Sequence, residues 1–265
     1  ASNTALGRSS LSGNTTGADN TAVGYVSLLS NTTGAGNSAL GMSSLNTNTT
    51  GASNTAIGKQ ALFSNTTAAN NTAVGYAAGY ANTTGTIDAI GYYALVDNTT
   101  GARNAAFGNS ALQNNTTGAD NVAVGRNSMN DNVTGNSNTA VGDQSLYNNT
   151  ANYNTAIGDI ALHNNLGASE NTAVGHKSAF TNTTGTELTA IGERSLEANT
   201  TGASNTALGR VALLGNTTGS FNTGVGSRAL QSNTTAAGNT AVGYQSYYDN
   251  TTGAANVGVG FRSAY

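Results

Sequence analysis

The apolar and polar residues of this chain follow one pattern of 17 residues from beginning to end. A full copy is the segment 20–36, Asn-Thr-Ala-Val-Gly-Tyr-Val-Ser-Leu-Leu-Ser-Asn-Thr-Thr-Gly-Ala-Gly, in which we number Asn20 as position 1. The glycine of position 5 returns sixteen times, always after 17 residues except for two intervals of 16 that end at Gly91 and Gly158. An unbroken period of this length predicts a solenoid in which each repeat forms one coil.

Positions 1 to 5 have the alternation of a short β-strand. Position 3 is always Ala or Gly, position 4 is always apolar, and position 2 is mostly Thr, as in Thr21, Ala22 and Val23. Because successive residues of a strand face opposite sides, we expect the aliphatic column of position 4 in the coil interior and the small column of position 3 against a close neighbour. Glycine at position 5 ends the strand.

A second short strand is predicted over positions 7 to 10 or 11, where position 8 is Ser or Ala and position 9 is mostly Leu, as in Leu28. Asn-Thr-Thr-Gly then turns the chain back. The expected fold is therefore all-β, a parallel β-solenoid or β-roll of about sixteen 17-residue coils. We expect residues 1–265 to form a single repeat domain that belongs to a longer fibre.

Asparagine marks two further columns, at positions 1 and 12. Stacked one coil apart, at ~4.8 Å, their amides can hydrogen-bond along the stack as two ladders. Position 1 is replaced by Ile87 and Leu188, each after a Gly-Thr variant of the turn. The two shorter intervals lose their residue in the turn after position 12, so we expect the strands to keep their register.

The small size of positions 3 and 8 favours packing of several copies around an axis, because two large apolar positions per coil make a thin core. Position 10 is also more apolar than a freely exposed column, as in Leu29, Phe63, Tyr80 and Phe180. The alternative is that Ala and Ser simply fit a narrow coil. We expect a homo-oligomer or a filament.

These repeats also resemble known ones. The Asn-Thr-Ala-Val-Gly units, for example 71–75 and 239–243, resemble the head repeats of YadA-like trimeric autotransporter adhesins and, more closely, repeat arrays of phage-type tail fibres. The resemblance implies a left-handed, trimeric β-roll in an extracellular fibre, on a cell surface or virion. The chain departs from the adhesin pattern in its longer coil with an added Asn-Thr-Thr-Gly turn.

Composition narrows the function classes. A net charge of −3 gives no electrostatic footprint for nucleic acid or for an anionic membrane. No apolar run is long enough to predict membrane insertion, and the absence of cysteine excludes disulfides and thiolate metal sites within these residues. The sequence carries no cofactor or metal motif, and we predict that the protein is not an enzyme.

Tyrosine supplies the candidate binding residues. Two clusters are predicted on adjacent coils, and their apolar faces with polar tips suit a cell-surface glycan or protein receptor. The alternative is packing against a neighbouring chain. The clusters comprise Tyr76, Tyr80, Tyr92 and Tyr93, and then Tyr244, Tyr247, Tyr248, Phe261 and Tyr265.

Position 6 holds a weaker candidate, a column of Asp143, Asp159, His176 and Glu193 on four successive coils. Neighbouring carboxylates there could bind a cation or act as an acid and base pair. The alternative is a solvated column balanced by Lys177, Arg194 and Arg210.

The function predicted first is a structural rod segment of an extracellular fibre or surface adhesin. The second hypothesis is an ice-binding β-solenoid that uses stacked Thr rows at positions 13 and 14, although adjacent residues of a strand face opposite sides. The third is a depolymerase with Asp143 and Asp159 as its acid and base pair.

Overall fold

The structure, a computed structural model, describes residues 2–264 and contains strands and turns without a helix in that range. The chain divides into two compact units, with the boundary between Asn136 and Ser137. The first contains β1 (Thr4–Leu6), β2 (Thr21–Val23), β3 (Ser38–Leu40), β4 (Thr55–Ile57), β5 (Thr72–Val74), β6 (Ile87–Ile90), β7 (Asn104–Phe107) and β8 (Val122–Val124). The second contains β9 (Thr139–Val141), β10 (Thr155–Ile157), β11 (Thr172–Val174), β12 (Thr189–Ile191), β13 (Thr206–Leu208), β14 (Thr223–Val225), β15 (Thr240–Val242) and β16 (Val257–Val259).

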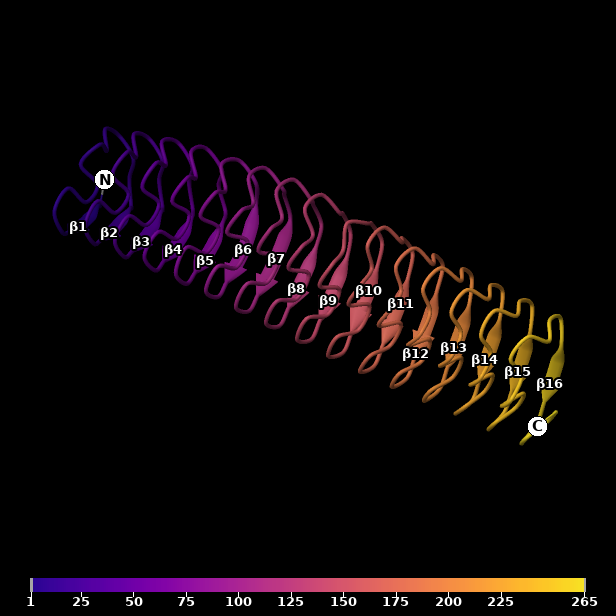
Figure 1. The fold of residues 1–265 in the computed structure, drawn as a ribbon. Helices are drawn as coiled ribbons and strands as arrows, with labels where there is room; N and C mark the ends of the chain where they lie inside the picture. The colour runs from indigo at the N-terminus through magenta and orange to yellow at the C-terminus, as the bar shows by residue number, and fades with distance from the viewer. Residues whose placement is uncertain (1, 265) are drawn as a thin grey trace. The chain divides into compact units, whose positions relative to one another are not determined.

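Within each unit the strands are parallel and lie in chain order, one per coil, which confirms the β-solenoid (Figure 1). Equivalent residues pair without slippage, as Ala22 with Ala39. The register also survives both shorter intervals, because Thr72 pairs with Asp88 and Thr139 with Thr155. The missing residue is therefore absorbed in the turns, as the sequence predicts.

The orientation of the strand predicted from the sequence is wrong. Position 3 faces the interior, where Ala22 is fully buried, and position 4 faces outward, where Leu40 is 50% and Ile157 41% exposed. The reason lies in the other side of the coil. Leucine at position 9, such as Leu28, is fully buried, as the sequence predicts, and fills the narrow interior so that only Ala or Gly fits opposite it.

The second strand predicted over positions 7 to 10 or 11 is also wrong, because these residues form consecutive turns. Positions 7 and 9 have left-handed backbones, with φ of 49° at Val26 and 50° at Leu28. Ser27 and Leu28 are adjacent and both fully buried, a departure from the alternation of a strand that has one face toward solvent. Position 8 is consequently part of the core and not a contact between chains.

Left-handed conformations cost roughly 1–2 kcal/mol for each non-glycine residue. Backbone hydrogen bonds between coils accompany them: Leu28 donates to Ser44 at 2.9 Å and Val26 donates to Arg8 at 3.0 Å. Each coil is thus bonded to its neighbours on the turn side as well as through its strand.

Two asparagine ladders run through the interior, as predicted. At position 12, the amide of Asn48 donates to the side-chain oxygen of Asn31 at 2.8 Å and to the carbonyl of Gly51 at 2.9 Å. At position 1, the side-chain oxygen of Asn20 accepts from the backbone N–H of Asn37 at 2.9 Å. Both columns are buried, and the ladders satisfy amides that would otherwise be costly to bury.

The exceptions to the core pattern compensate one another. Gly79 replaces the leucine of position 9, and a Cβ placed there would lie 2.6 Å from Cδ1 of Ile87, which has replaced the next asparagine of position 1. The same exchange recurs as Ala179 with Leu188, both buried. Near the end of the chain, Tyr247 occupies position 9 and Gly258 replaces alanine opposite its ring. Each unusually large residue in the core therefore lies next to an unusually small one, which keeps the core volume nearly constant along the chain.

Candidate functional site

The first tyrosine cluster comes together on the turn side of the coils that follow β5 and β6. The rings of Tyr76 and Tyr92 stack with centroids 5.3 Å apart. Tyr93 meets Tyr76 edge-on at 5.4 Å and lies 4.2 Å from Tyr92. The Lys59 ammonium lies 5.7 Å from the centre of the Tyr76 ring. These distances are within the range of favourable aromatic and cation–π contacts.

Tyr80 belongs to a second aromatic row, at position 10. It stacks on Phe63 with centroids 5.0 Å apart and ring planes 11° apart. The four tyrosines of the predicted cluster are therefore divided between two rows, one at positions 6 and 7 (Tyr76, Tyr92 and Tyr93) and one at position 10 (Tyr80).

A groove of about 360 Å³ separates these two rows. Ala77 lies at position 7, where the coils on either side carry Gln60 and Tyr93, and it leaves room that a larger side chain would fill. The groove spans parts of four successive coils. The sequence does not predict this extent, because each position was considered separately. Its lining consists of Gln60, Tyr76, Ala77, Tyr80, Tyr93, Val96, Asp97 and Gln113.

The polar groups that line the groove are phenols, two side-chain amides and one carboxyl group, that of Asp97. A side-chain hydrogen bond with Tyr92, assisted by partial desolvation, raises the pKa of Tyr93 above its ordinary value of 10.0. Tyr93 therefore keeps its proton at neutral pH and can donate or accept a hydrogen bond.

The second predicted cluster is smaller than expected. Tyr244 stacks on Phe261 at 5.5 Å, and the Arg262 guanidinium lies 5.3 Å from the Phe261 ring. Tyr248 is half-buried at position 10. Tyr247 occupies the interior position 9, where its ring lies against Gly258, and it is half-buried. Tyr265 lies outside the described residues.

A third aromatic row was missed by the sequence reasoning. His163 stacks on Tyr147 at 5.2 Å and lies 5.4 Å from Phe180, and its Nδ1 is 3.0 Å from Oδ1 of Asn164. All three rings occupy position 10 of successive coils. The sequence could have predicted this row, because Tyr147 and Phe180 belong to the apolar column of position 10 and His163 occupies the same position in the coil between them.

The acidic column of position 6 is largely divided among ion pairs. Asp159 lies 3.7 Å from Nε2 of His176, and Glu193 accepts from Arg210 at 2.9 Å. Arg194 pairs with Glu197. Asp143 is half-buried in the turn after β9. Within residues 2–264 no three His, Cys, Asp or Glu side chains gather closely enough to hold a metal ion, and the pairing of Asp143 with Asp159 in catalysis stays a prediction.

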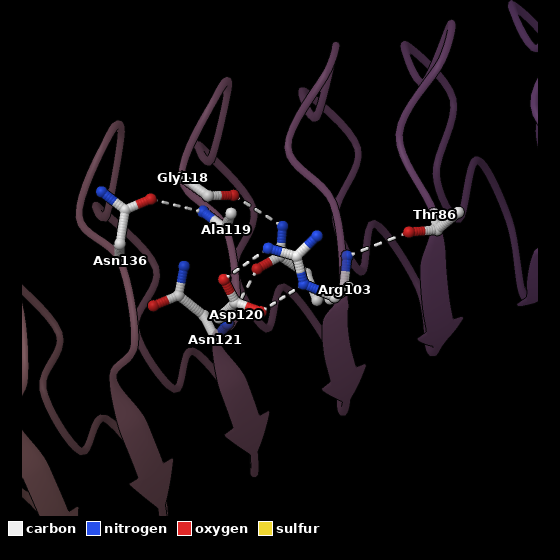
Figure 2. A network of polar contacts seen from close by, with 8 residues as sticks. Thr86, Arg103, Gly118, Ala119, Asp120, Asn121 and Asn136 are labelled. Atoms are coloured by element: carbon white, nitrogen blue, oxygen red, sulfur yellow. Dashed lines mark hydrogen bonds and ion pairs between the residues drawn. The ribbon is translucent and has the colours of Figure 1, made fainter.

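A polar network connects the corners of successive coils in the first unit (Figure 2). Arg103 binds both carboxylate oxygens of Asp120, at 2.5 and 2.7 Å, and its backbone N–H donates to Thr86 at 3.1 Å. A shallow hollow of about 240 Å³ lies beside it, lined in part by Asp88 and Arg103. Because Asp120 already binds the guanidinium in bidentate fashion, we read this hollow as part of the corner and not as a ligand site.

The strand side presents two outward columns, Thr at position 2 and an aliphatic residue at position 4. In the second unit seven coils in a row carry Thr at position 2, at Thr139, Thr155, Thr172, Thr189, Thr206, Thr223 and Thr240. In the first unit Ser38, Asp88, Ala105 and Val122 interrupt the column. The position-13 threonines, in contrast, donate to the next coil, as Thr32 does to the carbonyl of Thr49 at 2.9 Å.

Residues 2–264 contain no helix that is long enough and apolar enough to cross a membrane. Comparison with protein-family models, with curated proteins and with solved structures gave no match. Two features of the coils are candidates for function: an outward apolar column on the strand side, and an aromatic groove on the turn side.

Proposed function

We propose that this chain is a structural segment of an extracellular fibre or surface adhesin, of the tail-fibre or trimeric-adhesin kind, on a cell surface or virion. In the proposed assembly three left-handed solenoids pack with their strand sides toward a common axis. The observation that supports this most is the outward aliphatic column of position 4. Five successive coils carry Leu40, Ile57, Val74, Ile90 and Phe107 at this position, and all of them except the half-buried Val74 are 39–50% exposed.

The free energies gained by burying these side chains add up along the column. Full burial of one such side chain contributes about 1.5–3 kcal/mol, so burying the exposed third of eight of them contributes about 5 kcal/mol per unit and chain. A large, contiguous apolar surface that a single chain leaves exposed usually marks a site where another molecule binds. A second copy of the same column is a matching partner because both have the same coil spacing.

Mechanical stiffness is the activity that this assembly provides. Backbone hydrogen bonds join successive coils on the strand side and on the turn side, and the two asparagine ladders join them inside. Bending or stretching a unit would break several of these bonds at each coil.

Pairwise distances between spin labels test the arrangement. The chain has no cysteine, so Val174→Cys places one label on the strand side and Thr184→Cys places one on an exposed turn. We expect a shorter distance between copies for the label at 174 than for the label at 184. The reverse order would place the turn side at the axis, and the absence of any distance between copies would refute the assembly.

Ice binding is the second candidate, favoured by the seven successive outward threonines of the second unit. They repeat at the coil spacing of ~4.8 Å beside a flat aliphatic column. This surface is the same one that the trimer would cover, so the two functions exclude each other there. Thermal hysteresis by a monomeric chain, lost in Thr189→Lys, would support ice binding, and its absence would eliminate it.

A further inference from the structure

We propose that the groove over Ala77 binds a neutral saccharide, held between the tyrosine rows of positions 6 and 7 and of position 10. This inference adds an attachment site to the proposed structural role and does not rest on it, because every lining residue belongs to one chain and one unit.

The groove is produced by one local change in the repeat. Position 7 carries larger side chains in the coils on either side, Gln60 and Tyr93, whereas Ala77 is 4% exposed and forms the floor. Its backbone φ of 52° resembles that of the other residues at position 7, such as Arg194 at 57°. The small side chain is therefore not required by the backbone, and the coil would accept a larger one.

The walls match the two kinds of surface that a sugar ring presents. Tyr80 and Tyr93 supply aromatic surface for the C–H face of the ring, as aromatic residues do in many ligand sites, and Tyr76, which stacks on Tyr92, completes that wall. Gln60, Gln113 and Asp97 supply amide and carboxylate groups that can bond its hydroxyls. A volume of about 360 Å³ is at the small end of ligand sites, which span about 300–1,000 Å³.

The charge of the groove selects among saccharides. Asp97 is the one acidic residue among the lining residues, and no Lys, Arg or His lines the groove with it. Lys59 lies against the Tyr76 ring at 5.7 Å. A sulfated or sialylated sugar would meet the Asp97 carboxylate without a lining cation to compensate, so the groove favours a neutral ring.

The position of the groove also leaves it accessible in the assembly proposed above. Its residues occupy positions 6, 7, 10 and 11, whereas the apolar column occupies position 4 on the strand. A glycan could therefore bind whether the chain is a trimer or a monomer, and failure of one proposal leaves the other standing.

The test is calorimetric titration of the full chain with maltotriose, cellotriose, triacetylchitotriose and lacto-N-tetraose, and with sialyllactose as the anionic comparison. We expect at least one neutral probe to bind, and Ala77→Arg to weaken it at least tenfold by filling the groove. Arginine already occupies position 7 at Arg194 and Arg228, so this variant should fold, which circular dichroism checks.

Tyr93→Ser is the second variant, with the same expected loss through removal of a wall. Tyr153→Ala is the matched control, since Tyr153 is 63% exposed and lies outside the groove, and it should bind as the unmodified chain does. Binding that survives in Ala77→Arg, binding of sialyllactose alone, or no binding by any neutral probe at millimolar concentration would each overturn the proposal.

Discussion

The strand side and the turn side of a coil cover the same core but differ in how far their residues vary. Positions 2 to 4 repeat Thr-Ala-Val or a close variant in most coils, whereas position 6 runs through Lys59, Tyr76, Tyr92 and Asn109 within one unit. A surface that must match another copy at each coil needs a repeated residue. A surface that meets solvent, or one ligand at one place, does not.

The most disruptive test of this difference places charge on the strand side. Leu208→Lys, Val225→Lys and Val242→Lys together put three like charges on adjacent coils, where they repel one another and cannot be buried between copies. We expect the particle mass to fall to that of one chain, measured by light scattering. The matched control, Ser227→Lys with Tyr244→Lys, extends a cationic column from Arg210 on the turn side and should leave the mass unchanged.

A second test separates the interior face of the strand from its outer face. Ala106→Leu overfills the core beside a buried leucine and should lower the free energy of unfolding by about 1–3 kcal/mol or more. Phe107→Leu, at an outward side chain that is 39% exposed and in a column that also carries Leu40 and Leu208, should change it by no more than about 0.5 kcal/mol. Urea unfolding in the charged, monomeric background measures both, and the opposite ranking would restore the orientation that the sequence alone predicts.

The sequence predicts the repeat and its spacing correctly but predicts the wrong orientation for the strand. The period, the parallel coils, the glycine that ends each strand and both asparagine ladders follow from residue spacing alone. The facing of Ala22 and Val23 does not, because alternation defines two faces without saying which is interior. The decisive fact is the left-handed backbone at Leu28, which no propensity for leucine predicts.

Only part of the candidate site could be predicted from the sequence. Tyr76, Tyr92 and Tyr93 could be placed together from their positions on adjacent coils. The groove between them and Tyr80 could not, because it depends on the direction of position 7 and on the small side chain of Ala77, which is an ordinary residue in this composition.

A third test uses the compensating pair in the core. Ile87→Asn alone should leave a void beside Gly79, and Gly79→Leu alone should collide with the Ile87 side chain. The double variant restores the usual pair of leucine and asparagine. We expect each single variant to be less stable than the double one, with a coupling energy of about 0.5–3 kcal/mol, and additive effects would show that the two residues do not share one space.

The smallest expected effect concerns the corner pair Arg103 and Asp120. The hydrogen bond from the guanidinium lowers the pKa of Asp120 below its ordinary value of 3.8. Its contribution to stability is therefore present above that ordinary value and is lost as pH falls through the lower, folded-state pKa. The urea midpoint of the unmodified chain should exceed that of Arg103→Gln slightly at neutral pH, and the difference should vanish in acid. A difference that grows in acid would contradict the assigned sign.

The most direct test of the central claim is the mass of the unmodified chain in solution, measured by light scattering over a dilution series. The proposed trimer has three times the chain mass of 26.3 kDa, and this mass should persist at low concentration because the trimer would bury the strand sides against one another. A mass of one chain at every concentration would contradict it and would leave the outward threonine and aliphatic columns exposed to solvent.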